Sequence, residues 1–169
     1  MDGKDDLRLA QSVKASAASP RRARNRVALE VKRAGAKSSA QRLRSAARLF
    51  LRRLGVRGAE LSICLVGDAA IRRLNRTWRR IDRPTDVLSF PAGQMPGAAQ
   101  GPKLLGDVVI SVDTARRRAG MSRRALDAEL ARYLAHGLLH LLGYDHHTRA
   151  QAASMAKLEE SLLGERGLI

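Results

Sequence analysis

The four histidines of this chain lie within twelve consecutive residues, and this cluster restricts the fold more than any other feature. His136 and His140 are four residues apart in a leucine-rich stretch with helical periodicity, so both imidazoles project from one helix face. Gly143 then allows the chain to leave the helix, and His146 follows three residues later. The spacing predicts that three imidazoles converge on one cation. His147 is expected either to be exposed or to contact one of the metal ligands without binding the metal itself.

Three protein ligands leave a coordination position open, as a catalytic rather than a structural zinc site requires. The competing interpretation makes the histidines ordinary polar residues on a partly buried helix, but three of them in this spacing favour a metal site. The pattern H-x-x-x-H-x-x-G-x-x-H also fits the metzincin proteases, which carry a general-base Glu directly after the first His. That position is Gly137 here, so a protease would lack its proton acceptor.

The rest of the chain alternates between strand-like and helix-like patterns. Val27, Leu29 and Val31 alternate with other residues, as in a strand with one buried face. We predict a single α/β (α+β) domain, in which a small mixed four-stranded sheet packs with about five helices. The expected strands span residues 26–32, 60–66, 86–90 and 104–111, and the expected helices span 39–54, 69–78, 113–120, 122–143 and 148–163.

Capping and breaking residues place several of these boundaries. Ser38 or Ser39 is expected to cap the first helix, and Asp68 and Asp113 are expected to cap the second and third. Pro91 is expected to stop the third strand, because proline has no N–H for a sheet ladder.

Charge narrows the class of partner. The 169 residues include 32 Lys and Arg against 16 Asp and Glu, a net charge of +16 that indicates nucleic acid or anionic lipid. Residues 1–25 are predicted to be a basic disordered tail, with an RNA-touching arm as the alternative. Residues 26–165 form the predicted domain, with a surface loop at 92–103. The single cysteine excludes an intramolecular disulfide framework and a Cys-rich zinc finger.

Three segments resemble one known family. Residues 136–146, H-G-L-L-H-L-L-G-Y-D-H, resemble the signature of the YbeY family, the bacterial endoribonucleases that mature ribosomal RNA. Residues 74–79, L-N-R-T-W-R, and 83–91, R-P-T-D-V-L-S-F-P, resemble its central block, and 105–111, L-G-D-V-V-I-S, its next strand. The blocks keep the family's order, and the resemblance covers about residues 26–163.

The resemblance implies a cytoplasmic, metal-dependent endoribonuclease with one divalent ion, Zn²⁺, on His136, His140 and His146. It implies cleavage of single-stranded RNA in 16S rRNA 3′-end maturation and in ribosome quality control. The expected partners are rRNA and the small ribosomal subunit, with a ribosomal protein or an assembly GTPase as further partners. Neither a membrane nor DNA is expected as a partner.

The resemblance also implies a functional arginine near the metal, which carries over to Arg79. A guanidinium can bind two phosphoryl oxygens through parallel bonds while negative charge develops there during phosphodiester cleavage. Arg73, Arg76 and Arg80 are weaker candidates for contacts with the RNA backbone.

Two other functions stay open at this point. One is a ribosome assembly factor whose metal site is mainly structural, and the other is a protease-like metallohydrolase of another substrate class. The sequence names no obvious general base. Asp86 and Asp107 lie at or near strand starts and could be close to the site, and Asp145 is expected to order the turn or orient a ligand.

Overall fold

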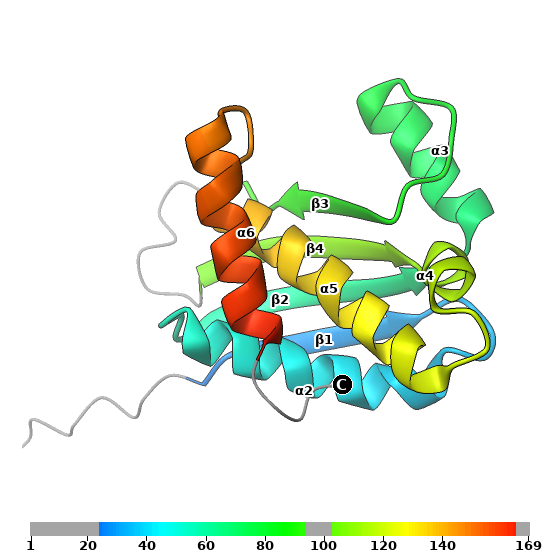
Figure 1. The fold of residues 1–169 in the computed structure, drawn as a ribbon, viewed down its shortest axis with the longest axis horizontal. Helices are drawn as coiled ribbons and strands as arrows, with labels where there is room; N and C mark the ends of the chain where they lie inside the picture. The colour runs from blue at the N-terminus through cyan, green and yellow to red at the C-terminus, as the bar shows by residue number, and fades with distance from the viewer. Residues whose placement is uncertain (1–23, 94–102, 165–169) are drawn as a thin grey trace, which may run out of the picture.

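The computed structural model describes residues 24–93 and 103–164. Figure 1 shows them as one sheet with its helices packed around it, so the predicted single α/β domain with a mixed sheet is confirmed. The strands are β1 (Arg26–Val31), β2 (Ala59–Val66), β3 (Val87–Pro91) and β4 (Lys103–Ser111). The five helices of the described chain are α2 (Lys37–Arg53), α3 (Asp68–Arg79), α4 (Val112–Ala119), α5 (Arg123–Leu141) and α6 (Arg149–Leu163).

The four strands lie in the order β1-β2-β4-β3. β1, β2 and β4 are parallel, whereas β3 runs antiparallel to β4 and forms one edge. In this register Ile63 of β2 lies between Leu29 of β1 and Val108 of β4, and Val108 pairs with Ser89 of β3. The three parallel strands therefore share an apolar row, which ends at the polar Ser89 on the edge strand.

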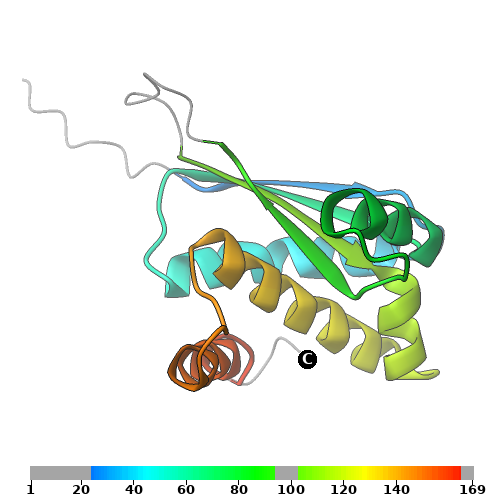
Figure 2. The ribbon, with the colours of Figure 1, turned by 90° about the horizontal axis from the view of Figure 1, so that it is seen from above.

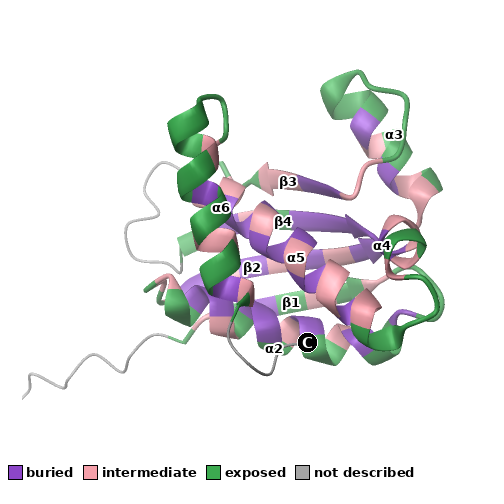
Figure 3. Ribbon diagram, viewed as in Figure 1, coloured by how far each residue is buried: buried purple, intermediate pink, exposed green. Residues whose placement is uncertain are grey.

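Most of the core lies on one face of the sheet. Helices α2 and α5 cover that face, and α6 packs outside α5 (Figure 2). Ile63, Phe50 of α2 and Leu134 of α5 are completely buried there. Figure 3 shows the buried residues concentrated on the strands and on the inner sides of these two helices.

Helix α3 lies on the opposite face of the sheet, as Figure 2 shows. A smaller apolar cluster holds it there, in which Ile71 of α3 packs with Val66, Leu88 and Val109. Most of its outer surface is exposed (Figure 3). Its position thus depends on few apolar contacts and on the polar contacts described below.

Three predicted caps are wrong in detail. Ala36 precedes α2 without a side-chain cap, because Ser39 is buried within the first turn rather than outside it. Gly67 precedes α3, and Asp68 already lies in the helix with its carboxylate directed to α4. Ser111 caps α4 by accepting a hydrogen bond from the Thr114 backbone N–H, which leaves Asp113 in the first turn.

β3 ends at Pro91 as predicted, although the proline itself still belongs to the strand and pairs with Gly106. An edge strand tolerates proline because one side of its backbone needs no partner. None of the helices in the described ranges combines the length and apolar character needed to span a bilayer. The predicted tail and loop lie outside the described residues, except for positions 24–25, 92–93 and 103.

Candidate metal centre

An apolar stripe fixes the rotation of α5 and with it the direction of two histidines. Leu130, Leu134 and Leu138 are fully buried toward the core. His136 and His140 therefore project from another side of the helix, where both are half-buried. Their ring centroids are 4.6 Å apart and their Nε2 atoms are 3.1 Å apart. The predicted pairing of these two imidazoles on one face is confirmed.

The turn after α5 brings in the third histidine. Gly143 has a φ of 88°, a left-handed conformation that glycine adopts readily, and its N–H donates to the His140 carbonyl at 3.0 Å. The ring of His146 then lies 5.8 Å from that of His136 and 5.1 Å from that of His140. One ligand nitrogen from each histidine lies within 4.8 Å of the other two. The cluster could hold a metal ion, as the spacing predicted.

A carboxylate from α6 contacts the first histidine, and sequence analysis missed it. Glu159 Oε1 lies 2.7 Å from Nδ1 of His136. A carboxylate that accepts the Nδ1–H holds the ring in the tautomer whose Nε2 is free for a metal. The signal was present in the pattern: Glu159 is four residues after buried Met155 and three before buried Leu162. An acid on the inner stripe of an otherwise amphipathic helix is unusual.

Replacing Glu159 with alanine is expected to weaken metal binding about 10- to 100-fold, because the His136 ring loses the group that orients it. Glu159→Gln keeps a neutral acceptor and should lose less. Competition with a chromophoric chelator measures both affinities. Glu160→Ala removes an exposed acid one position away and is the matched control. Equal affinities in the Glu159 and Glu160 variants would contradict the orienting role.

The electrostatics of the cluster favour metal binding near neutral pH. Burial lowers the pKa of His140, and the neighbouring His136 and His146 lower it further. A lowered pKa extends the neutral form of the imidazole to more acidic solutions, and only the neutral form offers a lone pair to a cation. His140 is therefore held ready as a ligand rather than as a charged group.

Gly137, between the two helical histidines, contacts the sheet directly. Its carbonyl accepts a hydrogen bond from Ser89 Oγ at 3.0 Å, and a Cβ at this position would lie 2.8 Å from Val108 Cγ1 and 3.1 Å from Val87 Cγ2. A glutamate cannot occupy this position without displacing β3 and β4. The absence of the protease general base is thus built into the packing of the fold.

Substituting Gly137 with alanine is expected to lower the free energy of unfolding by about 1–2 kcal/mol. Alanine favours a helix by about 1 kcal/mol, but overpacking against Val108 typically costs about 1–3 kcal/mol and should prevail. Urea denaturation followed by circular dichroism measures the difference. A variant as stable as the parent chain would show that the strands can move away without penalty.

The residues around the third histidine order the turn. Asp145 Oδ1 accepts a hydrogen bond from the His146 backbone N–H at 2.7 Å, which lowers the pKa of this carboxyl. Its other oxygen lies 2.7 Å from Nε2 of His147, which is exposed. Asp145 is therefore a turn residue, and His147 stands outside the cluster, in agreement with both predictions.

The predicted arginines lie on α3, on the other face of the sheet. Arg73, Arg76, Arg79 and Arg80 are all exposed. Arg79 is the last residue of the helix, and Arg80 ends it in a left-handed conformation with a φ of 59°. Among the described residues, Arg79 makes no hydrogen bond or ion pair, and no contact joins it to the histidines. Its guanidinium is free to bind a ligand.

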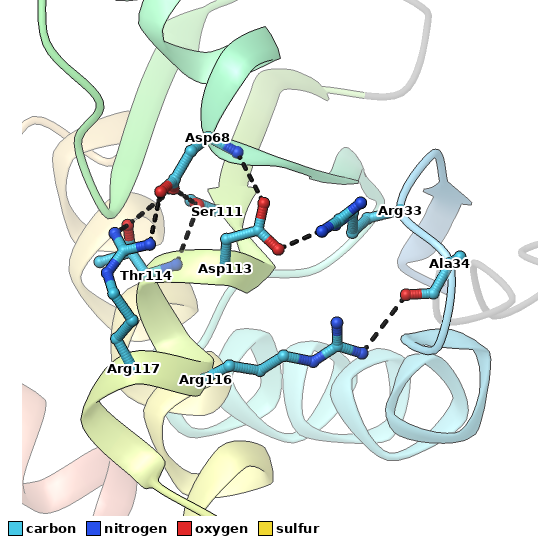
Figure 4. Close-up of polar contacts among 8 residues, drawn as sticks. All are labelled: Arg33, Ala34, Asp68, Ser111, Asp113, Thr114, Arg116 and Arg117. Carbon is cyan, nitrogen blue, oxygen red and sulfur yellow. Dashed lines mark hydrogen bonds and ion pairs between the residues drawn. The ribbon is translucent and has the colours of Figure 1, made fainter.

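Polar contacts hold the first turn of α3 to α4 (Figure 4). The Asp68 carboxylate accepts hydrogen bonds from Ser111 Oγ at 2.5 Å and Thr114 Oγ1 at 3.0 Å, and pairs with Arg117 at 2.5 Å. Burial alone would raise the pKa of Asp68, but these three bonds outweigh it and the pKa is lowered. Its backbone N–H donates to Asp113 at 3.0 Å.

The far end of α3 has separate supports. Asn75 is buried, and its Nδ2 donates to the Arg83 carbonyl at 2.8 Å. The exposed Trp78 packs edge-on against Phe90 of β3, with centroids 5.8 Å apart. Arg79 therefore projects from a helix that is fixed at both ends.

Known proteins resemble this chain in both the sequence and the fold that carry these three histidines. A family model described as Endoribonuclease YbeY matches residues 26–167. The chain belongs to the YbeY endoribonuclease family. It is 55% identical over 150 residues to the Endoribonuclease YbeY of Myxococcus xanthus (strain DK1622), covering 89% of this chain and 51% of that relative.

A second YbeY relative, from Anaeromyxobacter sp. (strain Fw109-5), is 59% identical over 133 residues, which cover 79% of this chain and 68% of the relative. The chain thus spans about half the length of the Myxococcus relative and about two thirds of the Anaeromyxobacter one. The solution structure of a Thermotoga maritima protein superposes with a TM-score of 0.51 at 24% identity, covering 82% of this chain and 89% of that one. That likeness shows the fold alone.

Two further acids of the YbeY blocks lie outside the candidate ligand group. Asp86 Oδ1 accepts hydrogen bonds from the Val87 N–H at 3.0 Å and from Thr85 Oγ1 at 3.1 Å, so it orders the loop before β3. Asp107 is exposed on β4 and pairs in register with Phe90, which packs toward α3. Neither carboxylate joins the three histidines as a ligand within the described chain.

Proposed function

We propose that this chain is a cytoplasmic, metal-dependent endoribonuclease that cuts single-stranded RNA in the maturation of the 16S rRNA 3′ end and in ribosome quality control. The observation that carries the proposal is the convergence of His136, His140 and His146 in a chain of the YbeY family. The net charge of +16 supports a polyanionic substrate, and the small ribosomal subunit is the proposed partner.

The donor set fits a zinc-type ion. Three imidazole nitrogens within 4.8 Å of one another suit Zn²⁺ and leave room for a further ligand. Such an ion would supply a Lewis acid for a phosphate oxygen and would lower the pKa of a bound water toward neutrality. His136 and His140 would bind the ion from one rigid helix, and the Glu159 carboxylate would hold the His136 ring in its orientation.

We assign to Arg79 the stabilisation of the negative charge on those phosphoryl oxygens that the metal ion would not contact. As the phosphoryl group accepts electron density, the free guanidinium of Arg79 would bind its oxygens in a bidentate manner. Arg73, Arg76 and Arg80 would contact neighbouring backbone phosphates, since all three are exposed on or at the end of the same helix. The RNA strand would thus pass over the edge of the sheet at β3, because α3 and α5 lie on opposite faces of the sheet (Figure 2).

A cleavage assay with three substrates tests the proposal. The metal-loaded chain is incubated with a labelled single-stranded RNA, with the same RNA as a duplex, and with casein. Internal cuts in the single strand alone are expected, and they should disappear with His140→Ala. RNA that is bound but never shortened would favour the assembly factor with a structural metal. Casein fragments that depend on the histidines would favour the protease-like hydrolase.

A further inference from the structure

Two guanidinium groups flank a buried aromatic ring on α5, and the proposed reaction uses neither of them. The Cζ atom of Arg132 lies 5.2 Å from the centroid of the Tyr133 ring, and that of Arg118 of α4 lies 6.0 Å from it. These distances are in the range of cation–π contacts. Arg132 also pairs with Glu129 at 2.6 Å. The group joins α4 to α5.

Helical geometry places this group beside the candidate metal centre. Glu129, Tyr133, His136 and His140 follow one another at spacings of four, three and four residues, so they form one stripe along α5. Arg132 bends onto that stripe, because its guanidinium contacts both Glu129 and Tyr133. The backbone of Arg132 lies about one helical turn, roughly 5–6 Å along the axis, before that of His136, and its guanidinium extends farther toward the N-terminus of α5, where it meets Glu129.

The environment holds the guanidinium in place and leaves part of it free. Tyr133 is only 2% exposed, so its ring is a fixed support. Burial raises the pKa of Tyr133 to about 12, so its hydroxyl carries no charge that would repel an anion. The side chain of Arg132 is 43% exposed, and only one of its nitrogens bonds to Glu129. Its remaining N–H groups can reach a ligand.

The acids near the group limit its net charge but leave its donors available. Glu129 offsets one of the two positive charges. The negative charge of Asp86 also attracts Arg132 electrostatically, although the Oδ1 atom of Asp86 already accepts a hydrogen bond from the Val87 N–H. Arg118 has no ion pair among the described residues. The site therefore attracts an anion through directed guanidinium donors rather than through a large excess of charge.

We propose that Arg132 and Arg118 form a phosphate subsite that binds a backbone phosphate of the RNA on the side of the candidate metal centre that faces α4. Both guanidinium groups meet on the stripe of α5 that leads to His136, and the free N–H donors of Arg132 suit phosphate oxygens. The proposal rests on the proposed function, because it assigns the substrate's phosphates to this stripe.

Binding of RNA without cleavage provides the test. Fluorescence anisotropy with a labelled 2′-O-methyl single-stranded dodecamer is measured over a range of salt concentrations. Arg132→Gln should raise Kd about five-fold and reduce the slope of log Kd against log salt by about one contact. Arg118→Gln should have a similar but smaller effect. Glu129→Gln is the matched control, because it breaks the same ion pair while leaving the guanidinium in place.

The control separates binding from stability. Glu129→Gln should bind RNA as well as the parent chain or more tightly, although it loses the same ion pair as Arg132→Gln. Equal weakening in both variants, or an unchanged Kd and salt slope in Arg132→Gln, would overturn the subsite. A parent chain that binds the dodecamer through Arg132 but never cuts RNA would uphold the subsite while the proposed endoribonuclease activity fails.

Discussion

Replacing His140 with alanine is expected to remove nearly all bound divalent metal and, with it, RNA cleavage. Two remaining imidazoles make a poor site, and because even the loss of an outer hydrogen-bond partner commonly lowers metal affinity 10- to 100-fold, losing a ligand should lower it by more than about 100-fold. Elemental analysis after gel filtration measures the metal, and a labelled single-stranded RNA measures the cutting.

His147→Ala is the matched control for that experiment. It removes an imidazole from the same turn, but the side chain is 81% exposed, and within the described residues its ion pair is with Asp145. It should keep stoichiometric metal and full cleavage. Circular dichroism of both variants shows whether α5 survives. Stoichiometric metal in a folded His140→Ala protein would refute the assignment of the three histidines as ligands.

Arg79→Ala should retain metal and fold but cut bound RNA about 30- to 1000-fold more slowly. Loss of one contact that forms in the transition state typically costs about 2–4 kcal/mol. Arg79→Lys should recover only part of the rate, because an ammonium cannot bridge two oxygens. Single-turnover cleavage at saturating protein separates this step from binding.

The control for Arg79 should come from the same helix without disturbing its end. Arg80 has the same charge, but it closes α3 in a left-handed conformation, so substitutions there also affect the helix terminus. Arg73 is exposed in the first half of the helix, and Arg73→Ala should weaken RNA binding while leaving the single-turnover rate almost unchanged. Similar mild slowing in both variants would reduce Arg79 to part of a basic surface.

Local pattern predicts most of this fold. Alternating apolar residues mark the strands, and the predicted helix starts at 122 and 148 are where Ser122 and Thr148 cap α5 and α6. The convergence of the histidines could be foreseen as well, since helical spacing and Gly143 act within eleven residues. These features depend on neighbours in the chain.

Features that depend on distant contacts escaped prediction. Glu159 meets His136 across 23 positions, and only the packing of α6 on α5 joins them. Asp68 resembles a cap in sequence, yet its carboxylate is drawn to Ser111 and Arg117, 43 and 49 residues later. The pairing of Pro91 itself with Gly106 depends on β3 being an edge strand, which only the completed sheet shows.

The alternation of side chains in β3 makes this five-residue strand intolerant of length changes. Ser89 points to the helix with the histidines and bonds to Gly137, whereas Phe90 points the other way to Trp78, next to Arg79. Deleting or inserting one residue within the strand would exchange the two faces, so a phenyl ring would be directed at the Gly137 contact and a hydroxyl at the tryptophan. Length variation among relatives is therefore expected outside this strand rather than within it.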